Sequence, residues 1–171
     1  ILLDLSTKVY VFSENMRKQV LSIKKSVYHK LDKINPGIDT KRFIPICNKD
    51  ELKKTLTIPT DSFVFLLIGR LSEVKGFDLA IKAFSELNNC NGLLLIVGSG
   101  PELEKLIQIS KELNLAAKVI FINQTSVAEQ YYQISDAFIM SSTYESFGQT
   151  ILEAMSSGLP VVGFKPDGIN V

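Results

Sequence analysis

The stretch "SFVFLLIGRLSEVKGFDLAIKAF", residues 62–84, contains the pattern that decides the fold. Residues 62–69 form a continuous apolar run that ends in glycine, which is typical of a strand buried on both faces. From residue 76 onward, apolar side chains recur with the spacing of one face of a helix. The stretch therefore predicts a buried strand followed, after a short loop, by a helix.

The same alternation recurs to the end of the chain. Further strands are predicted at 92–98, 118–122, 136–142 and 159–164, and helices at 76–89, 101–114, 126–135 and 148–158. Apolar strands that alternate with helices favour a parallel sheet covered on both faces. We therefore predict an α/β fold with a doubly wound, Rossmann-like parallel sheet. Ligands of such sheets bind beyond the carboxyl ends of the strands, so we expect the site in the loops after residues 69, 98, 122 and 142.

The beginning of the chain has a different organisation. A strand at 8–13 precedes a helix for which Ser13 is the predicted N-cap. Residues 30–45 contain two prolines and a Pro-Gly pair and are predicted to be an irregular connector. We place a domain boundary here, with residues 1–35 in one part and 36–171 in the other. The chain lacks an initial methionine and stops just after the fifth strand, so we expect a piece of a longer protein, cut at both ends.

The composition argues against several classes of function. A formal net charge of +1 provides no electrostatic footprint for nucleic acid or an anionic membrane. The two cysteines, Cys47 and Cys90, form no CxxC motif, and the single histidine, His29, stands apart from them, so neither a disulfide framework nor a zinc site is expected. No apolar stretch reaches the roughly 18 residues that span a bilayer. We therefore expect a cytoplasmic location, with no metal and no cofactor.

Two of the predicted loops carry candidate ligand-binding groups. Arg70 and Lys75 lie between Gly69 and Gly76, after a strand and before a helix. A guanidinium binds phosphate with two hydrogen bonds and an ammonium adds a mobile charge, so the pair would suit a diphosphate. Solvated surface cations are the alternative. In the second loop, Gly98 could let a ligand approach the backbone, although a tight turn is the better interpretation of "GSG".

The third candidate is a pair of acids, Glu145 and Glu153, in "ESFGQTILE". If the helix begins near Gly148, Glu145 lies in the loop before it and Glu153 in its second turn. The N–H groups of Gly148, Gln149 and Thr150 are then free to meet a phosphate at the positive end of the helix. The alternative is that Glu145 only favours the helix dipole and Glu153 is one polar residue of an amphipathic helix. Against this, apolar residues flank Glu153 on both sides, and a carboxylate in such surroundings needs a partner.

These motifs resemble those of retaining glycosyltransferases of the family 4 type with the GT-B fold. The matching segments are "NPGID" at 35–39, "GRLSEVKG" at 69–76, "LLIVGSGPE" at 94–102 and "ESFGQTILEAMSSGLPVV" at 145–162. The last is similar to the family's motif of two glutamates separated by seven residues. The resemblance covers the chain from about residue 8 and identifies residues 36–171 as the C-terminal, donor-binding domain. Residues 1–35 would then belong to the end of the acceptor-binding N-terminal domain.

The resemblance implies a role for each matching residue. Arg70 and Lys75 would hold the diphosphate of a UDP- or GDP-sugar, Glu145 would contact the transferred sugar, and Glu153 would bind the ribose hydroxyls. The implied donor-binding residues, with Arg70, Lys75 and Glu145 also as catalytic residues, are Gly69, Arg70, Lys75, Gly98, Asn123, Gln124, Glu145, Ser146, Phe147, Gly148, Gln149, Thr150 and Glu153. Asn123 and Gln124 would border the base. Asn123 stands where family members usually have glycine, a replacement that a left-handed turn tolerates.

The implied reaction transfers a sugar to a glycan or lipid-linked acceptor with retention of configuration and without a metal. Surface polysaccharide or glycoconjugate synthesis at the inner face of the membrane would be its setting, with membrane contact through the N-terminal domain. Two alternatives stay open at this point. The chain could bind nucleotide-sugars without turnover, or it could belong to an epimerase of the same fold.

Overall fold

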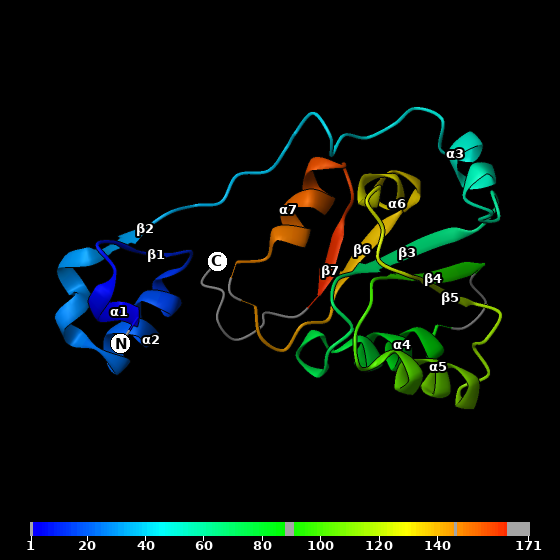
Figure 1. Ribbon diagram of the computed structural model, residues 1–171. Helices are drawn as coiled ribbons and strands as arrows, with labels where there is room; N and C mark the ends of the chain where they lie inside the picture. The colour runs from blue at the N-terminus through cyan, green and yellow to red at the C-terminus, as the bar shows by residue number, and fades with distance from the viewer. Residues whose placement is uncertain (1, 88–90, 146, 164–171) are drawn as a thin grey trace.

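A computed structural model describes residues 2–87, 91–145 and 147–163 of the chain (Figure 1). Its main sheet has five parallel strands in the order β5-β4-β3-β6-β7. These strands are β3 (Phe63–Ile68), β4 (Gly92–Val97), β5 (Val119–Ile122), β6 (Ala137–Met140) and β7 (Val161–Gly163). The predicted doubly wound sheet is confirmed, and all five predicted strands are present.

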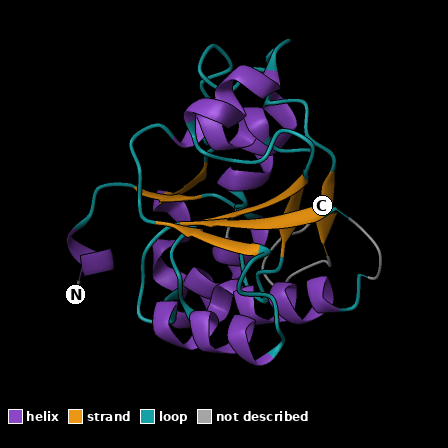
Figure 2. Ribbon diagram, turned by 90° about the vertical axis from the view of Figure 1, so that its right-hand side faces the viewer, coloured by secondary structure: helices purple, strands orange, loops and turns teal. Residues whose placement is uncertain are grey.

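Helices cover both faces of this sheet (Figure 2). The helices are α4 (Phe77–Ser85), α5 (Leu103–Glu112), α6 (Ala128–Ile134) and α7 (Gln149–Ser156), which match the four predicted ones. In Figure 1, α4 and α5 lie on one face and α6 and α7 on the other. The chain moves outward from β3 to β5 and then returns to β6 on the other side of β3. This reversal places the topological switch point, where ligands bind in such sheets, between the ends of β3 and β6.

The core consists of two apolar layers, one on each face of the sheet. One joins Val64 and Leu66 to the buried side chains of α6 and α7, and the other joins Leu67 to those of α4 and α5. All six residues of β4 are buried, as expected for a central strand with helices on both sides. Burying each large apolar side chain contributes about 1.5–3 kcal/mol to the free energy of folding. These two layers therefore stabilise the sheet from whose strand ends the loops of the site extend.

The N-terminal part has its own small core. It contains α1 (Leu2–Leu5), β1 (Val9–Val11), α2 (Glu14–Ile23), the 3-10 helix η1 (Lys25–Lys30) and β2 (Leu31–Lys33). Ser13 caps α2 as predicted, because its hydroxyl accepts a hydrogen bond of 3.1 Å from the Met16 N–H. Val11, Val27 and Leu31 are buried together there, apart from the two layers of the main sheet. The boundary near residue 35 stays a prediction.

Several elements were not predicted from the sequence, namely α1 and η1 in the N-terminal part and also β2 and α3. β2 lies inside the stretch predicted to be irregular and pairs in parallel with β1. It has three residues, only one of them apolar, which is too short for a recognisable alternation. The helix α3 (Lys49–Thr55) was also missed, although Asn48 accepts a hydrogen bond from the Glu51 N–H, as an N-cap does.

Candidate functional site

The loops that follow β3 and β4 are locked together through their backbones. Leu71 N–H donates to Ser99 O at 2.9 Å, and Glu102 N–H donates to Leu71 O at 3.1 Å. A Cβ on Gly98 would lie 1.9 Å from Gly69 O, so only glycine allows this approach. The glycine at 98 is therefore required by contact with the neighbouring loop, which agrees with the tight-turn interpretation. The result is a rigid rim at the carboxyl end of the sheet.

A pocket of about 640 Å³ opens beside this rim. Five of the predicted donor-binding residues line it: Gly69, Arg70, Gly98, Gln124 and Glu153. The pocket lies beyond the carboxyl ends of β3, β4 and β5, at the edge of the sheet where ligands of parallel sheets bind. Apart from Glu153, its lining comes from the β3–β5 side of the switch point. The pocket is therefore lined both by Arg70 from the first loop and by Glu153 from α7.

Sequence reasoning missed several other residues of the lining. The missed residues are Ile68, Val97, Ser99, Thr125 and Ala128, whereas Gly100, the second glycine of "GSG", had been considered with Gly98. The loop after β4 had been identified, but its serine carried no signal of its own. The Ser99 hydroxyl donates to Gln124 Oε1 at 3.3 Å, so the second and third loops are joined across the pocket. Gln124 lines the pocket, and its proposed position beside a base stays a prediction.

Asn123 differs from its predicted surroundings. It is exposed and is not among the residues that line the pocket. Among the described residues other than glycine, a positive φ occurs at Thr57 and Asn114, so Asn123 forms no left-handed turn. A left-handed turn is therefore not the reason that asparagine is tolerated here, and the role of Asn123 beside the base stays a prediction.

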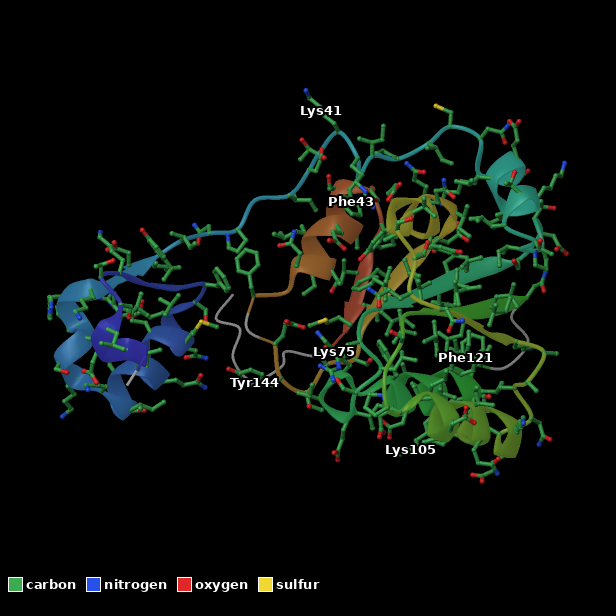
Figure 3. All side chains as sticks on the ribbon, viewed as in Figure 1. Lys41, Phe43, Lys75, Lys105, Phe121 and Tyr144 are labelled. Carbon is green, nitrogen blue, oxygen red and sulfur yellow. The ribbon has the colours of Figure 1, made fainter. Side chains whose placement is uncertain are left out.

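Lys75 and Glu145 form an ion pair at the switch point. Lys75 Nζ lies 2.5 Å from Glu145 Oε2, and their side chains are 24% and 14% exposed. Lys75 ends the 3-10 helix η2 (Glu73–Lys75), whose carbonyl at Lys75 accepts from the Ser141 hydroxyl at 2.8 Å. Figure 3 shows Lys75 beside the loop that precedes α7. Arg70, by contrast, is exposed and lines the pocket, so the two predicted phosphate-binding cations have different surroundings.

Glu153 has a buried partner that was not predicted. It is the fifth residue of α7, in the second turn as expected, and its Oε2 accepts a hydrogen bond of 2.7 Å from the Tyr132 hydroxyl. Burial raises the pKa of the Glu153 carboxyl, whereas the Tyr132 hydroxyl and the Arg42 charge act to lower it. Burial beside this carboxylate also raises the pKa of Tyr132, which keeps the phenol protonated and able to donate. The carboxylate is thus oriented by a neutral donor.

The start of α7 has the predicted geometry. Gly148 precedes the helix with a left-handed backbone, at φ 83°, and is buried. The first N–H groups of the helix have no acceptor within the helix itself. Gln149 Nε2 donates to Gly37 O at 3.3 Å, and the Phe147 ring lies 6.3 Å from that of Phe12. The pocket lining does not include Lys75, Glu145, Phe147, Gly148, Gln149 or Thr150, so their predicted roles stay predictions. Ser146 lies outside the described residues.

Arg42 fastens the connector to the edge of the site. Its Nε donates to Glu129 Oε2 at 2.8 Å, and its second guanidinium nitrogen donates to Ser126 O at 2.7 Å. These acceptors lie at the start of α6, next to two residues that line the pocket, Thr125 and Ala128. The sequence predicted that this stretch is a connector, but gave no sign that it is joined to the start of α6.

The described residues offer no metal-ligand cluster of three or more His, Cys, Asp or Glu side chains. Within the same residues, no helix is long and apolar enough to cross a membrane.

Comparison with known proteins decides the family. Residues 48–171 match the profile of the family described as "Glycosyl transferases group 1". The chain belongs to this family. The match covers the whole main sheet and all of the residues that line the pocket. The resemblance identified from the sequence motifs is therefore confirmed.

Relatives of this glycosyltransferase family include enzymes named for different acceptors. The chain is 34% identical over 113 residues to the lipopolysaccharide core biosynthesis glycosyltransferase LpsD of Rhizobium meliloti, covering 66% of the chain and 32% of that protein. It is 26% identical over 176 residues to the D-inositol 3-phosphate glycosyltransferase of Mycolicibacterium smegmatis, covering 98% of the chain and 40% of the relative. The chain thus spans well under half the length of these two relatives.

Solved structures of glycosyltransferases share its fold. WaaG, which is involved in lipopolysaccharide biosynthesis, superposes with a TM-score of 0.83 at 22% identity, over 91% of this chain and 44% of that one. HepE of Anabaena, solved with UDP and glucose, superposes with a TM-score of 0.81 at 25% identity, over 95% of this chain and 46% of that one. The Rossmann-like fold of the group 1 glycosyltransferases is therefore shown for this chain.

Proposed function

We propose that the chain is the donor-binding part of a retaining glycosyltransferase that uses a UDP-sugar. The observation that carries the proposal is the pocket at the carboxyl end of the sheet, in which Arg70 and Glu153 stand in one cavity of about 640 Å³. A nucleoside diphosphate needs a cation for its phosphates and hydroxyl acceptors for its ribose, and this pocket offers both. The relative HepE, whose structure was solved with UDP-glucose, supports uridine over guanosine.

In this proposal each side chain has a separate task. Glu153 accepts hydrogen bonds from the ribose hydroxyls, and the loop of Gln124 borders the base. Arg70 binds the diphosphate directly. Lys75 starts from its ion pair with Glu145 and is shared with the phosphates when the donor binds. Glu145, relieved of part of its counter-charge, then accepts a hydrogen bond from the transferred sugar.

The bond-breaking step places negative charge on the departing diphosphate. We infer that Arg70, Lys75 and the N-terminus of α7 stabilise this charge, which is an arrangement of fixed donors and dipoles. The leaving phosphate would take the proton of the acceptor hydroxyl on the same face of the sugar, which retains the configuration. This scheme uses no metal and no cofactor.

For the acceptor, we propose a glycan or a lipid-linked sugar. The relatives named for lipopolysaccharide synthesis, LpsD and WaaG, support this class. We propose that this acceptor is met at the inner face of the cytoplasmic membrane, which places the protein in the cytoplasm with peripheral membrane contact. Product analysis with the full-length protein would separate sugar transfer from epimerisation of the donor.

The test is calorimetric titration of the chain with UDP, GDP and ADP. We expect UDP to bind most tightly and Arg70→Ala to raise its Kd by about 10- to 100-fold, because a charge-assisted hydrogen bond contributes about 1.5–3 kcal/mol. Lys111→Ala is the matched control, since Lys111 is an exposed cation in the last turn of α5 and does not line the pocket. Equal affinity of the parent and a folded Arg70→Ala variant for UDP would exclude the proposed placement of the diphosphate.

A further inference from the structure

Tyr132 is one of the largest fully buried side chains of the molecule, and its ring is fixed on two sides. Its exposed fraction is 0%, although it ends in a hydroxyl. The ring of Phe43 meets it edge-on at 5.6 Å, and the ring of Phe138 lies 5.8 Å away. The Phe43 backbone is itself tied to α7, because the Ser156 hydroxyl donates to Phe43 O at 2.6 Å. A ring packed in this way holds its hydroxyl at a defined point.

That point is the carboxylate of Glu153. The Tyr132 hydroxyl lies 2.7 Å from Glu153 Oε2 and 3.5 Å from Thr150 O. Its shorter hydrogen bond is therefore the one to the carboxylate. Glu153 lines the pocket, whereas Tyr132 is absent from its lining. A carboxylate offers about four acceptor positions, so this single bond leaves others for hydroxyls of a ligand.

The neighbouring cation cannot supply the same orientation. Arg42 acts on Glu153 through its charge, but its guanidinium is engaged by Glu129 Oε2 and Ser126 O. The Tyr132 hydroxyl is the group that makes a directional bond with the carboxylate. A directional bond fixes the rotation of the side chain, which a distant charge does not.

We propose that Tyr132 is a positioning residue that orients the Glu153 carboxylate toward the ribose, and so sets the preference for ribonucleotides over 2′-deoxyribonucleotides. The inference rests on the proposed function, in which Glu153 binds the ribose hydroxyls. A carboxylate that a hydrogen bond already orients can accept hydrogen bonds from both vicinal ribose hydroxyls at little cost in side-chain entropy. Without the Tyr132 hydroxyl, the Glu153 side chain is free to rotate. The hydrogen bond from the second ribose hydroxyl to the carboxylate is then weakened.

The experiment compares UDP with 2′-deoxy-UDP by calorimetry for the parent, Tyr132→Phe and Tyr131→Phe. Tyr131 is the matched control, because it is the preceding residue of α6, is also buried and loses the same atom. We expect Tyr132→Phe to weaken UDP about tenfold and to leave 2′-deoxy-UDP nearly unchanged, since it removes one hydrogen bond to a charged group. Tyr131→Phe should keep the parent's ratio of the two affinities.

Two further measurements separate positioning from a loss of stability. In Glu153→Gln, adding Tyr132→Phe should not change the ratio again, because the two act through one contact. Carbon NMR of the Glu153 carboxyl should show a higher pKa in Tyr132→Phe than in Tyr131→Phe, since the lost hydrogen bond lowers that pKa.

The outcomes distinguish this inference from the function beneath it. If the parent binds UDP and Tyr132→Phe keeps the parent's ribose preference, Tyr132 has only a packing role and the inference is overturned. If the parent binds no nucleoside diphosphate, the proposed function itself fails.

Discussion

Replacing Gly98 with alanine tests whether the rim of the pocket is built as the structure describes. The added Cβ would lie 1.9 Å from Gly69 O and 3.0 Å from Gly69 C, both of them backbone atoms that cannot rotate away. Gly98 also has φ +148°, an angle that side chains rarely adopt. Relief requires the loops after β3 and β4 to separate by about 1 Å, since a normal carbon–oxygen contact is more than 3 Å.

The expected cost follows from these two effects. Overpacking a well-filled contact costs about 1–3 kcal/mol and an unfavourable backbone angle about 1 kcal/mol more. The sum, about 2–4 kcal/mol, corresponds to a fall in Tm of about 5–15 °C for a chain of this size. Because Arg70 follows Gly69 directly, the same displacement moves the proposed phosphate-binding group, and we expect UDP affinity to fall at least tenfold.

Gly37→Ala is the control for this experiment. No heavy atom lies within 4 Å of the position that its Cβ would occupy, and Gly37 is exposed. Thermal unfolding followed by circular dichroism, with calorimetry for UDP, measures both variants. Gly37→Ala should stay within about 0.5 kcal/mol of the parent. A Gly98→Ala protein with the parent's Tm would show that the two loops are not in contact, and the description of the pocket would be wrong.

Two further predictions concern charged groups on either end of the sheet. Burial raises the pKa of Glu153 above its ordinary value of 4.5, so the folded state holds the proton more tightly, and the parent should lose stability as pH rises from 4.5 through the raised pKa. Glu153→Gln lacks this titrating carboxyl, so its free energy of unfolding relative to the parent should rise with pH in denaturant titrations between pH 4 and 8. A difference that is constant with pH would show that the pKa of Glu153 is not raised by folding. At the opposite end of the sheet, Asp136 Oδ2 accepts from Val64 N–H at 2.9 Å and lies 3.8 Å from Nζ of Lys53, whose side chain is 5% exposed. Asp136→Asn leaves this ammonium without its counter-charge and should cost about 2 kcal/mol, which urea denaturation measures, and adding Lys53→Met should recover part of it; full stability of the single variant would refute the pairing.

The main sheet was predictable because its signals are local and repeated. Each of the five strands is an apolar run, and each of the first four is followed by a helical pattern. This repeated order favours a single arrangement, a parallel sheet with helices on both faces. β2 and α3 gave weaker signals. β2 exists through its pairing with β1, which lies 22 residues earlier by the register of Val9 with Leu31, and a three-residue segment does not reveal such a partner.

The candidate site was predictable in part of its lining, namely Gly69, Arg70, Gly98, Gln124 and Glu153, but not in its side-chain pairings. Arg70 and Lys75 come from one loop and looked equivalent in the sequence, yet one lines the pocket and the other binds Glu145. The sequence separation in that pair is 70 residues, and in the pair of Tyr132 with Glu153 it is 21. The periodic spacing of apolar residues indicates which residues lie at the carboxyl end of the sheet. It does not indicate loop conformations, which decide how those residues pair.

The two acids of the predicted site are held in different ways, and this difference bears on how the site works. Glu153 stands on a helix and is fixed from the core by Tyr132, so its position is set before any ligand arrives. The loop of Glu145 is joined by side chains to the N-terminal part of the chain: the Tyr144 hydroxyl lies 3.2 Å from Gln19 Oε1.

Figure 3 shows Tyr144 between the N-terminal part and the main sheet. The rings of Phe12 and Phe147 make a second contact between the same two parts. The group proposed to face the ribose is therefore held entirely within the part of the chain that contains the main sheet, whereas the loop of the group proposed to face the transferred sugar contacts both parts. On the proposed function, we expect nucleotide binding to precede the placement of the sugar, because only the second step would require the N-terminal part to be in position.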